Sequence, residues 1–217
     1  MIGRRGLMLG AAGLALGCEE RLPSSAVYGL IDVSGSYFRE LDKAMRTFRV
    51  MMAGLRAHDS FAVAEIGACS FTDDAVVLRF TAPDRPTERQ RLIAAGAQRL
   101  AAYASRARAT NFTDIRGALI QAAQYLASRE ADQRSIVVFS DFEEDLPPNC
   151  RRDTPLPREL AGMTVIATNV TRLPEDNRDP ARYARRLESW KKLVEAAGAR
   201  WQLLPDPADV VAALRPR

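Results

Sequence analysis

The sequence has few of the residues and loops on which common enzyme classes depend. It contains one histidine, His58, which we expect at the opposite end of the fold from the polar motifs described below. A serine hydrolase needs a histidine base beside its nucleophile, so this placement argues against such an enzyme. A Gly-rich phosphate loop of the Walker type is also absent. We therefore expect that the protein is not an enzyme.

Charge of one sign is not concentrated in the sequence either. The formal net charge is +4, and without Arg4 and Arg5, which lie in a segment that we expect to be removed, 29 basic residues face 27 acidic ones. Nucleic-acid-binding domains carry a stronger and more localised basic field, so we expect no nucleic-acid partner. The 217 residues, 47% of them hydrophobic and 27% charged, are typical of one soluble globular domain with a sizeable core.

The N-terminal apolar run is too short to cross a bilayer. Residues 6–17 provide 12 residues, whereas a spanning helix takes about 20. With two arginines before it, this run is typical of a secretory signal. Residues 14–18 read Leu-Ala-Leu-Gly-Cys and resemble a bacterial lipobox, with Ala15 in place of the usual leucine. The resemblance implies that Cys18 is lipidated. The alternatives are an ordinary signal peptide cleaved nearby, a hydrophobic anchor, or a twin-arginine signal.

These features divide the chain into three parts. Residues 1–18 are predicted to be a signal peptide with a lipobox-like end, 19–25 a tether, and 26–217 one domain. Because the tether is short, we expect the domain close to a membrane of the bacterial cell envelope, held by the lipid and facing the periplasm. Glu19, rather than aspartate, follows Cys18, and the lipobox resemblance then favours the outer membrane in Gram-negative cells.

Two more cysteines, Cys69 and Cys150, lie within the predicted domain. Under the oxidising conditions that an exported protein meets, they have the opportunity to pair. The alternative is that Cys69, which ends an apolar run, is simply buried.

Apolar residues follow strand-like and helical periods in turn along the chain. Residues 26–33 form an apolar run of the kind found in a buried parallel strand, and from Phe38 the apolar residues recur at helical spacing. A short stretch joins the second and third predicted strands, which should therefore pair antiparallel. The pattern predicts strands at 26–33, 61–68, 75–80, 135–140, 163–170 and 200–204, and helices from 38, at 87–105, from 113, at 181–197 and from 209. The expected fold is α/β: a doubly wound, mostly parallel six-stranded sheet with one antiparallel edge strand and helices on both faces.

Three polar motifs occupy related places in this pattern. Asp32-Val33-Ser34-Gly35-Ser36 follows the first predicted strand, and Asp141 follows another buried strand. Thr113 stands at the start of a predicted helix. Because open α/β sheets bind ligands at the carboxyl ends of their strands, we expect these motifs to converge.

Together the motifs resemble the metal-ion-dependent adhesion site of von Willebrand factor type A (VWA) domains, which combines an Asp-x-Ser-x-Ser loop, a later threonine and an aspartate after the fourth strand. The order and spacing match from about residue 26 to the end. Thr110 is the rival threonine, but Thr113 has the better spacing to the following Gly-Ala-Leu. The resemblance implies that an ion is bound by the hydroxyls of Ser34 and Ser36, by Thr113 directly or through water, and by Asp32 and Asp141 mostly through water.

The residue types suit this chemistry. Oxygen ligands without a nearby histidine or thiolate select hard cations such as Mg²⁺, Mn²⁺ or Ca²⁺ over zinc. Neutral hydroxyls leave much of the ion's charge uncompensated, and helix N-termini beside the site favour an anion. The predicted partner is therefore a protein that presents an Asp or Glu carboxylate to the ion, supported by contacts from residues 106–112 and 142–160.

Other interpretations stay open at this point. Asp32, Ser34 and Ser36 also suit a helix N-cap. A phosphatase of the haloacid dehalogenase type would use Asp32 as its nucleophile, but it needs a second aspartate where Ser34 stands. A structural envelope domain without a bound metal is the third possibility.

Two charged groups are interpreted as solvated surfaces. Glu143, Glu144 and Asp145 are predicted to form an acidic rim, the alternative being additional cation ligands. The second group is predicted to be the solvated face of a basic helix, the alternative being a contact with anionic lipid headgroups; it comprises Arg182, Arg185, Arg186, Lys191 and Lys192.

Overall fold

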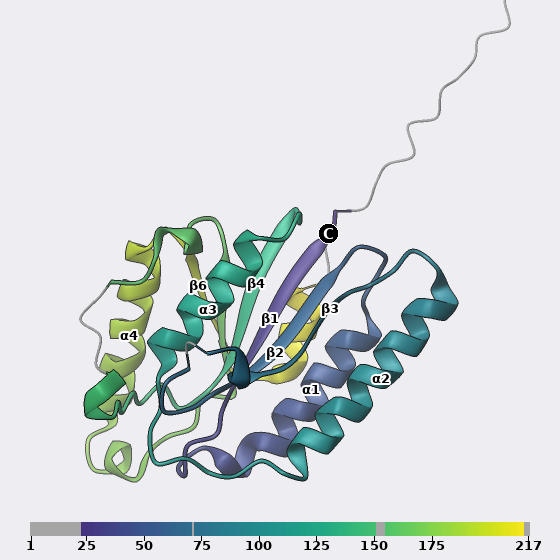
Figure 1. Cartoon of the computed structure of the whole chain (residues 1–217). Coiled ribbons are helices and arrows are strands. Elements are labelled where there is room, and N and C mark those ends of the chain that lie inside the picture. Colours follow the sequence, from purple (N-terminus) through teal and green to yellow (C-terminus); the bar gives the residue numbers. More distant parts are fainter. Residues whose placement is uncertain (1–22, 71, 151–154, 215–217) are drawn as a thin grey trace, which may run out of the picture.

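The computed structural model describes residues 23–70, 72–150 and 155–214 (Figure 1). The predicted signal peptide, Cys18 and residues 19–22 of the predicted tether lie outside the described residues.

A single sheet of six strands forms the centre of the described structure. Its order is β3-β2-β1-β4-β5-β6, and every neighbouring pair is parallel except β2 and β3, which are antiparallel. The predicted α/β fold class, including the antiparallel edge strand, is confirmed. The strands are β1 (Ser25–Asp32), β2 (Ser60–Ile66), β3 (Val76–Thr81), β4 (Gln133–Phe139), β5 (Thr164–Thr168) and β6 (Arg200–Leu204).

Burial along the strands follows their place in the sheet. All eight residues of β1 are buried, as expected of a central strand covered on both faces. In the edge strands β3 and β6, most residues are partly or fully exposed. The apolar runs in the sequence therefore identified the centre of the sheet most clearly.

Helices cover both faces of the sheet (Figure 1). On one face, α3 and α4 share a core cluster with the alternate β1 residues Ala26, Tyr28 and Leu30; α3 contacts β1, and α4 contacts β6. On the other face, α1, α2 and α5 share a core cluster with Val27 and Ile31; α1 contacts β1, α2 contacts β3, and α5 contacts β5 and β6. The helices are α1 (Leu41–Ala53), α2 (Pro86–Ala104), α3 (Ile115–Ala127), α4 (Pro180–Ala196) and α5 (Pro207–Ala213). None of the helices in the described residues has the length and apolar character needed to cross a membrane.

A glycine in β1 sets how closely α1 approaches the sheet. A Cβ atom built on Gly29 would lie 2.5 Å from Cε1 of Phe48, which is fully buried. The ring of Phe48 also meets Phe139 of β4 edge to face, with ring centroids 5.2 Å apart. Helix α1, which follows the Asp-x-Ser-x-Ser loop, is thereby packed tightly against the two strands that carry the site.

Three sequence predictions about helices are wrong in detail. Thr113 does not open α3; Asp114 is the N-cap, because its carboxylate accepts a hydrogen bond from the Gly117 N–H. His58 does not end a helix but lies in the turn before β2, with a positive φ of 67°, at the opposite end of the sheet from Asp32 as expected. Arg186 is not part of a solvated helix face, because its side chain is 7% exposed and ion-paired.

Candidate metal centre

The candidate site lies where two central parallel strands end. β1 ends at Asp32, and its neighbour β4 ends at Phe139, two residues before Asp141. Ile31 lies opposite Phe139 in the register of this pair. Parallel strands place their carboxyl ends at one edge of a sheet, here the lower edge in Figure 1, so both aspartates reach the same place.

Four of the five predicted ligands are joined by a continuous set of hydrogen bonds. Asp32 Oδ1 accepts from the Ser34 backbone N–H at 2.8 Å. The Ser34 and Ser36 hydroxyl oxygens lie 3.1 Å apart, and the Ser36 hydroxyl donates to Asp141 Oδ2 at 2.7 Å. The loop after β1 therefore brings two hydroxyls between the two carboxylates.

The site combines buried charge with an exposed edge. Asp32 and Asp141 are fully buried and Ser34 is nearly so, whereas Ser36 is exposed. The pKa of Asp32 is raised from 3.8 to about 6, chiefly by burial; the hydrogen bonds from Ser140 and Ser34 lower it, and the nearby charge of Asp141 raises it. At neutral pH Asp32 is consequently ionised in a place that disfavours its charge. A cation beside it would offset this cost.

Thr113 is held next to this set by its backbone. Its N–H donates to the Asp145 carbonyl at 2.7 Å, and Asp145 follows β4 in the same loop as Asp141. Thr110, three residues earlier, pairs with the backbone of the Ser34 loop. Among the described residues, no hydrogen bond joins the Thr113 hydroxyl to the other four predicted ligands. The rival Thr110 uses its own hydroxyl to donate to the Phe112 carbonyl at 2.8 Å.

The four joined residues fit a hard cation in ligand type and spacing. In an octahedral Mg²⁺ site with bonds of about 2.1 Å, neighbouring ligand oxygens lie about 3 Å apart. The spacings of 3.1 Å from Ser34 Oγ to Ser36 Oγ and 2.7 Å from Ser36 Oγ to Asp141 Oδ2 bracket this value. Within the described residues, no group of three or more His, Cys, Asp or Glu side chains is placed to hold a metal. The candidate ligands are instead two carboxylates together with neutral hydroxyls.

Comparison with known proteins bears on the fold. No protein-family model and no curated protein matches the sequence. A von Willebrand factor type A structure from Catenulispora acidiphila aligns over 88% of this chain and 41% of its own length, with 17% identity and a TM-score of 0.52. The chain has the VWA fold. This confirms, at the level of fold, the resemblance seen in the sequence.

Two further solved structures share the VWA fold of this chain. Manganese-loaded Plasmodium vivax TRAP aligns over 89% of this chain and 72% of its own, with 13% identity and a TM-score of 0.53. An aerotolerance-related membrane protein from Bacteroides fragilis aligns over 88% and 96%, with 14% identity and a TM-score of 0.52. At such identities the likeness concerns the fold alone.

Around this VWA sheet, sequence reasoning missed the residues that hold the loop after β4. The Ser140 hydroxyl donates to Asp32 Oδ2 at 2.6 Å and accepts from the Phe142 N–H at 2.9 Å. Helix α4 holds the same loop from the other side, since Arg186 Nε donates to the Asp141 carbonyl and Trp190 Nε1 to the Phe142 carbonyl, both at 2.9 Å. The four-residue spacing of Arg186 and Trp190 places both on one helix face, but it does not reveal the loop that they contact.

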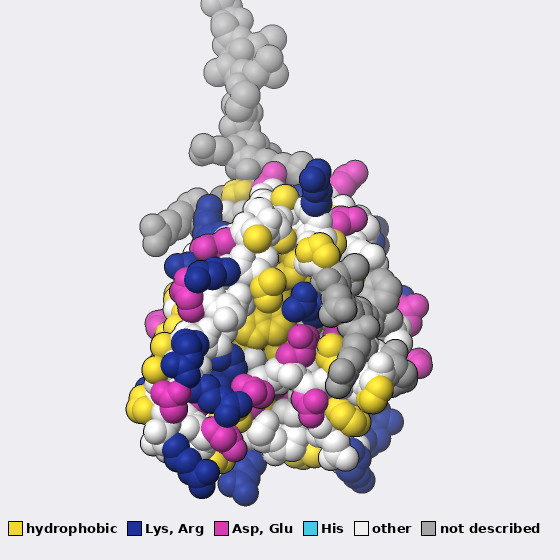
Figure 2. Space-filling view, turned by 90° about the vertical axis from the view of Figure 1, so that its left-hand side faces the viewer, with side chains coloured by type: hydrophobic (Ala, Val, Ile, Leu, Met, Phe, Trp, Pro, Cys, Tyr) yellow, Lys and Arg dark blue, Asp and Glu magenta, His cyan; other side chains and the backbone are white. Residues whose placement is uncertain are grey.

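Two of the three acidic residues after Asp141 are held by specific partners, whereas Asp145 is exposed, as expected of the predicted rim. Glu143 is bound by Arg182 Nη2 at 2.8 Å and Arg186 Nη1 at 3.4 Å. Glu144 accepts from the Arg116 N–H at 2.9 Å. On the face of the molecule shown in Figure 2, basic side chains likewise lie interspersed with acidic ones. Two arginines therefore form ion pairs with Glu143, which lies two residues after Asp141.

Proposed function

We propose that this chain is a metal-dependent protein-interaction domain of the bacterial cell envelope. A divalent cation of the Mg²⁺, Mn²⁺ or Ca²⁺ type would be held by Asp32, Ser34, Ser36, Thr113 and Asp141, and would bind a carboxylate of a protein partner. The observation that carries this proposal is the Ser36 hydroxyl, which lies in hydrogen-bond distance of both Ser34 and Asp141 and is exposed to solvent.

The charge of the site supports capture of an anion. Two carboxylates would formally balance the charge of a divalent cation, but both also accept hydrogen bonds from the protein. Asp32 accepts from Ser34 and Ser140, and Asp141 accepts from Ser36 and from the Glu143 N–H. Neutral hydroxyls on the exposed side would leave the ion's field uncompensated there. A partner's Asp or Glu side chain would complete the coordination from that side.

Solved structures of the same fold support the kind of function that we propose. The Plasmodium protein is described as manganese-loaded, and the Bacteroides protein is described as a membrane protein. A pilus adhesin from Lactobacillus rhamnosus, with 11% identity and a TM-score of 0.55, also shares the fold. By analogy, we propose that this chain also binds a divalent cation and a protein partner, and that it lies in the cell envelope.

The experiment that tests this function is an affinity pull-down from an envelope extract, in Mg²⁺ and in EDTA. We expect partners that are captured by the wild type in Mg²⁺ and lost in EDTA and in Ser34→Ala/Ser36→Ala. Ser128→Ala/Ser189→Ala, at two exposed serines away from the site, one at the C-cap of α3 and one on α4, is the matched control and should capture as the wild type does. The same partners in every arm would refute a metal-bridged contact.

The proposed anchor has its own test. Cys18→Ala should release the protein from the membrane into the soluble envelope fraction if a lipid on Cys18 holds it. Retention of this variant in the membrane fraction would contradict lipidation without bearing on the cation site.

A structural envelope domain that binds no metal is distinguished by thermal unfolding. Binding to the folded state alone must raise the melting temperature. An unchanged melting temperature over a series of Mg²⁺, Mn²⁺ and Ca²⁺ concentrations would favour the structural role.

A further inference from the structure

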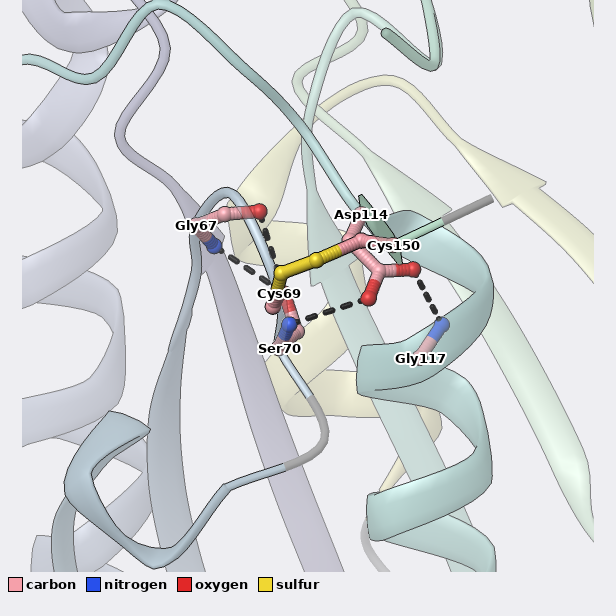
Figure 3. Close-up of a disulfide and its surroundings, with 6 residues drawn as sticks. All are labelled: Gly67, Cys69, Ser70, Asp114, Gly117 and Cys150. Carbon is pink, nitrogen blue, oxygen red and sulfur yellow. Dashed lines mark hydrogen bonds between the residues drawn. A yellow bond between two sulfur atoms is a disulfide. The ribbon is translucent and has the colours of Figure 1, made fainter. Parts of the chain in front are cut away.

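Asp114, the residue after Thr113, lies at the centre of a buried set of hydrogen bonds (Figure 3). Its carboxylate accepts from the Gly117 N–H at 2.7 Å, which caps α3, and from the Ser70 N–H at 3.0 Å. Its own N–H donates to the Gly67 carbonyl at 2.7 Å. Asp114 thus joins the start of α3 to the segment that follows β2.

Thr113 is paired on its other side with the segment that follows β4. Two backbone hydrogen bonds connect it to Asp145, from the Thr113 N–H at 2.7 Å and from the Asp145 N–H at 3.2 Å. Thr113 and Asp114 therefore lie between two segments, one after β2 and one after β4, and each contacts one of them.

A disulfide links those same two segments directly. Cys69, next to Ser70, is bonded to Cys150, five residues after Asp145, with their Cα atoms 5.8 Å apart and a separation of 81 positions in sequence (Figure 3). The covalent bond closes a ring of contacts around Thr113 and Asp114. Cys150 is buried, whereas Cys69 is partly exposed.

We propose that Asp114 and the Cys69–Cys150 disulfide position Thr113 for the cation, so that the cation affinity of the site depends on the disulfide. This inference rests on the proposed cation site. With the ring closed, the segments on either side of Thr113 cannot separate, and its backbone is held at one place. With the ring open, the segments move independently, and ordering Thr113 on the cation costs conformational entropy. Since disulfides form in oxidising compartments, the site would reach its full affinity after export.

The opening step is ordinary thiol–disulfide exchange. A thiolate of a dithiol attacks the Cys69 sulfur, and the Cys150 sulfur leaves and takes a proton. The second thiol of the reductant then displaces Cys69, which also takes a proton. The reductant is oxidised to a cyclic disulfide, and the two electrons it gives up reduce the cystine to two thiols.

The test compares Mn²⁺ binding by titration calorimetry for the oxidised protein and for protein reduced with dithiothreitol and desalted under nitrogen. We expect Mn²⁺ to bind the reduced protein about tenfold more weakly, which is the effect typical of losing a group that holds a metal ligand in place. In Thr113→Ala, reduction should no longer change the remaining affinity. Equal affinity in both redox states of the wild type, or an equal loss in Thr113→Ala, would overturn the inference. An oxidised protein that binds no Mn²⁺ would instead refute the proposed function.

Asp114→Ser gives the same test without touching the cysteines. Serine still offers an acceptor to the Gly117 N–H as an N-cap, but it leaves the Ser70 N–H without its carboxylate. We expect weaker Mn²⁺ binding with an unchanged circular dichroism spectrum at the titration temperature. Wild-type affinity in this variant would contradict a positioning role for Asp114.

Discussion

Replacing Asp32 with asparagine should change stability in opposite directions without and with a divalent cation. Burial raises the pKa of Asp32 from 3.8 to about 6, which corresponds to about 3 kcal/mol of stability lost when the group is ionised in the cation-free protein. Because the folded-state pKa is the higher one, this loss begins as the pH rises above about 4 and is complete above about 6. At pH 7.5 the cation-free protein therefore carries the full cost.

Asparagine removes the charge and keeps most of the hydrogen bonds. Its amide oxygen replaces the acceptor for the Ser34 N–H, and its amide nitrogen can donate to Ser140 Oγ. The Ser140 hydroxyl then has no acceptor for its own proton, and leaving this buried donor unpaired costs about 1–2 kcal/mol of stability. The cation-free variant should thus be about 1–2 kcal/mol more stable than the wild type at pH 7.5, with a melting temperature roughly 2–8 °C higher.

The cation should reverse this order. Mg²⁺ at a hundred times its Kd would stabilise the wild type by about 2.7 kcal/mol. The variant has lost one of the two carboxylates proposed to hold the ion, so Mg²⁺ should stabilise it less. The assay is calorimetric unfolding at pH 7.5 in EDTA and in Mg²⁺, with Asp209→Asn, at an exposed acid on α5, as the control that should alter neither value. At pH 5 the wild-type stabilisation by Mg²⁺ should shrink, because a proton competes for Asp32. A cation-free Asp32→Asn less stable than the wild type, or one that gains the full stabilisation from Mg²⁺, would refute the reasoning.

Three further changes test the fold around the site. Cys69→Ala/Cys150→Ala should lower the free energy of unfolding by about 4 kcal/mol in urea titrations, because the unfolded chain loses a cross-link across 81 residues; a loss below 1 kcal/mol would contradict this. Gly29→Ala should cost about 1–3 kcal/mol, since its Cβ would meet Phe48 at 2.5 Å, and unchanged urea stability would show that α1 moves freely. Arg186→Met should cost about 3–5 kcal/mol because it strands a fully buried carboxylate; urea unfolding with an unchanged midpoint would show the ion pair to be dispensable.

Much of the fold could be predicted from apolar patterning. Strand β6 was predicted with its observed bounds. The buried run of β1 was predicted within one residue, because burial on both faces demands continuous apolar residues. The places of Asp32 and Asp141 followed from the ends of the two central strands. Helix starts were less certain, since Thr113 and Asp114 are both suitable N-caps and tertiary contacts with Ser70 and Gly67 select the second.

The contacts that hold the loop after β4 could not be predicted in the same way. Arginine is usually exposed, and nothing local reveals that Arg186 is buried against Asp176, which lies in a short 3-10 helix (Pro174–Asn177) before α4. Burial lowers the pKa of Arg186, but its hydrogen bonds and ion pair with Asp176 outweigh this and raise it above its ordinary value. The same hydrogen bonds hold the pKa of Asp176 below its ordinary value. The pairing of Cys69 with Cys150 was equally open, because an even number of cysteines says nothing about whether the fold brings them together.

The central claim is tested most directly by diffraction from crystals grown with Mn²⁺, using the anomalous signal of the metal. The account predicts a peak at the carboxyl ends of β1 and β4, about 2.2 Å from the hydroxyl oxygens of Ser34 and Ser36. No peak there at saturating Mn²⁺, or a peak bound by other residues, would contradict it.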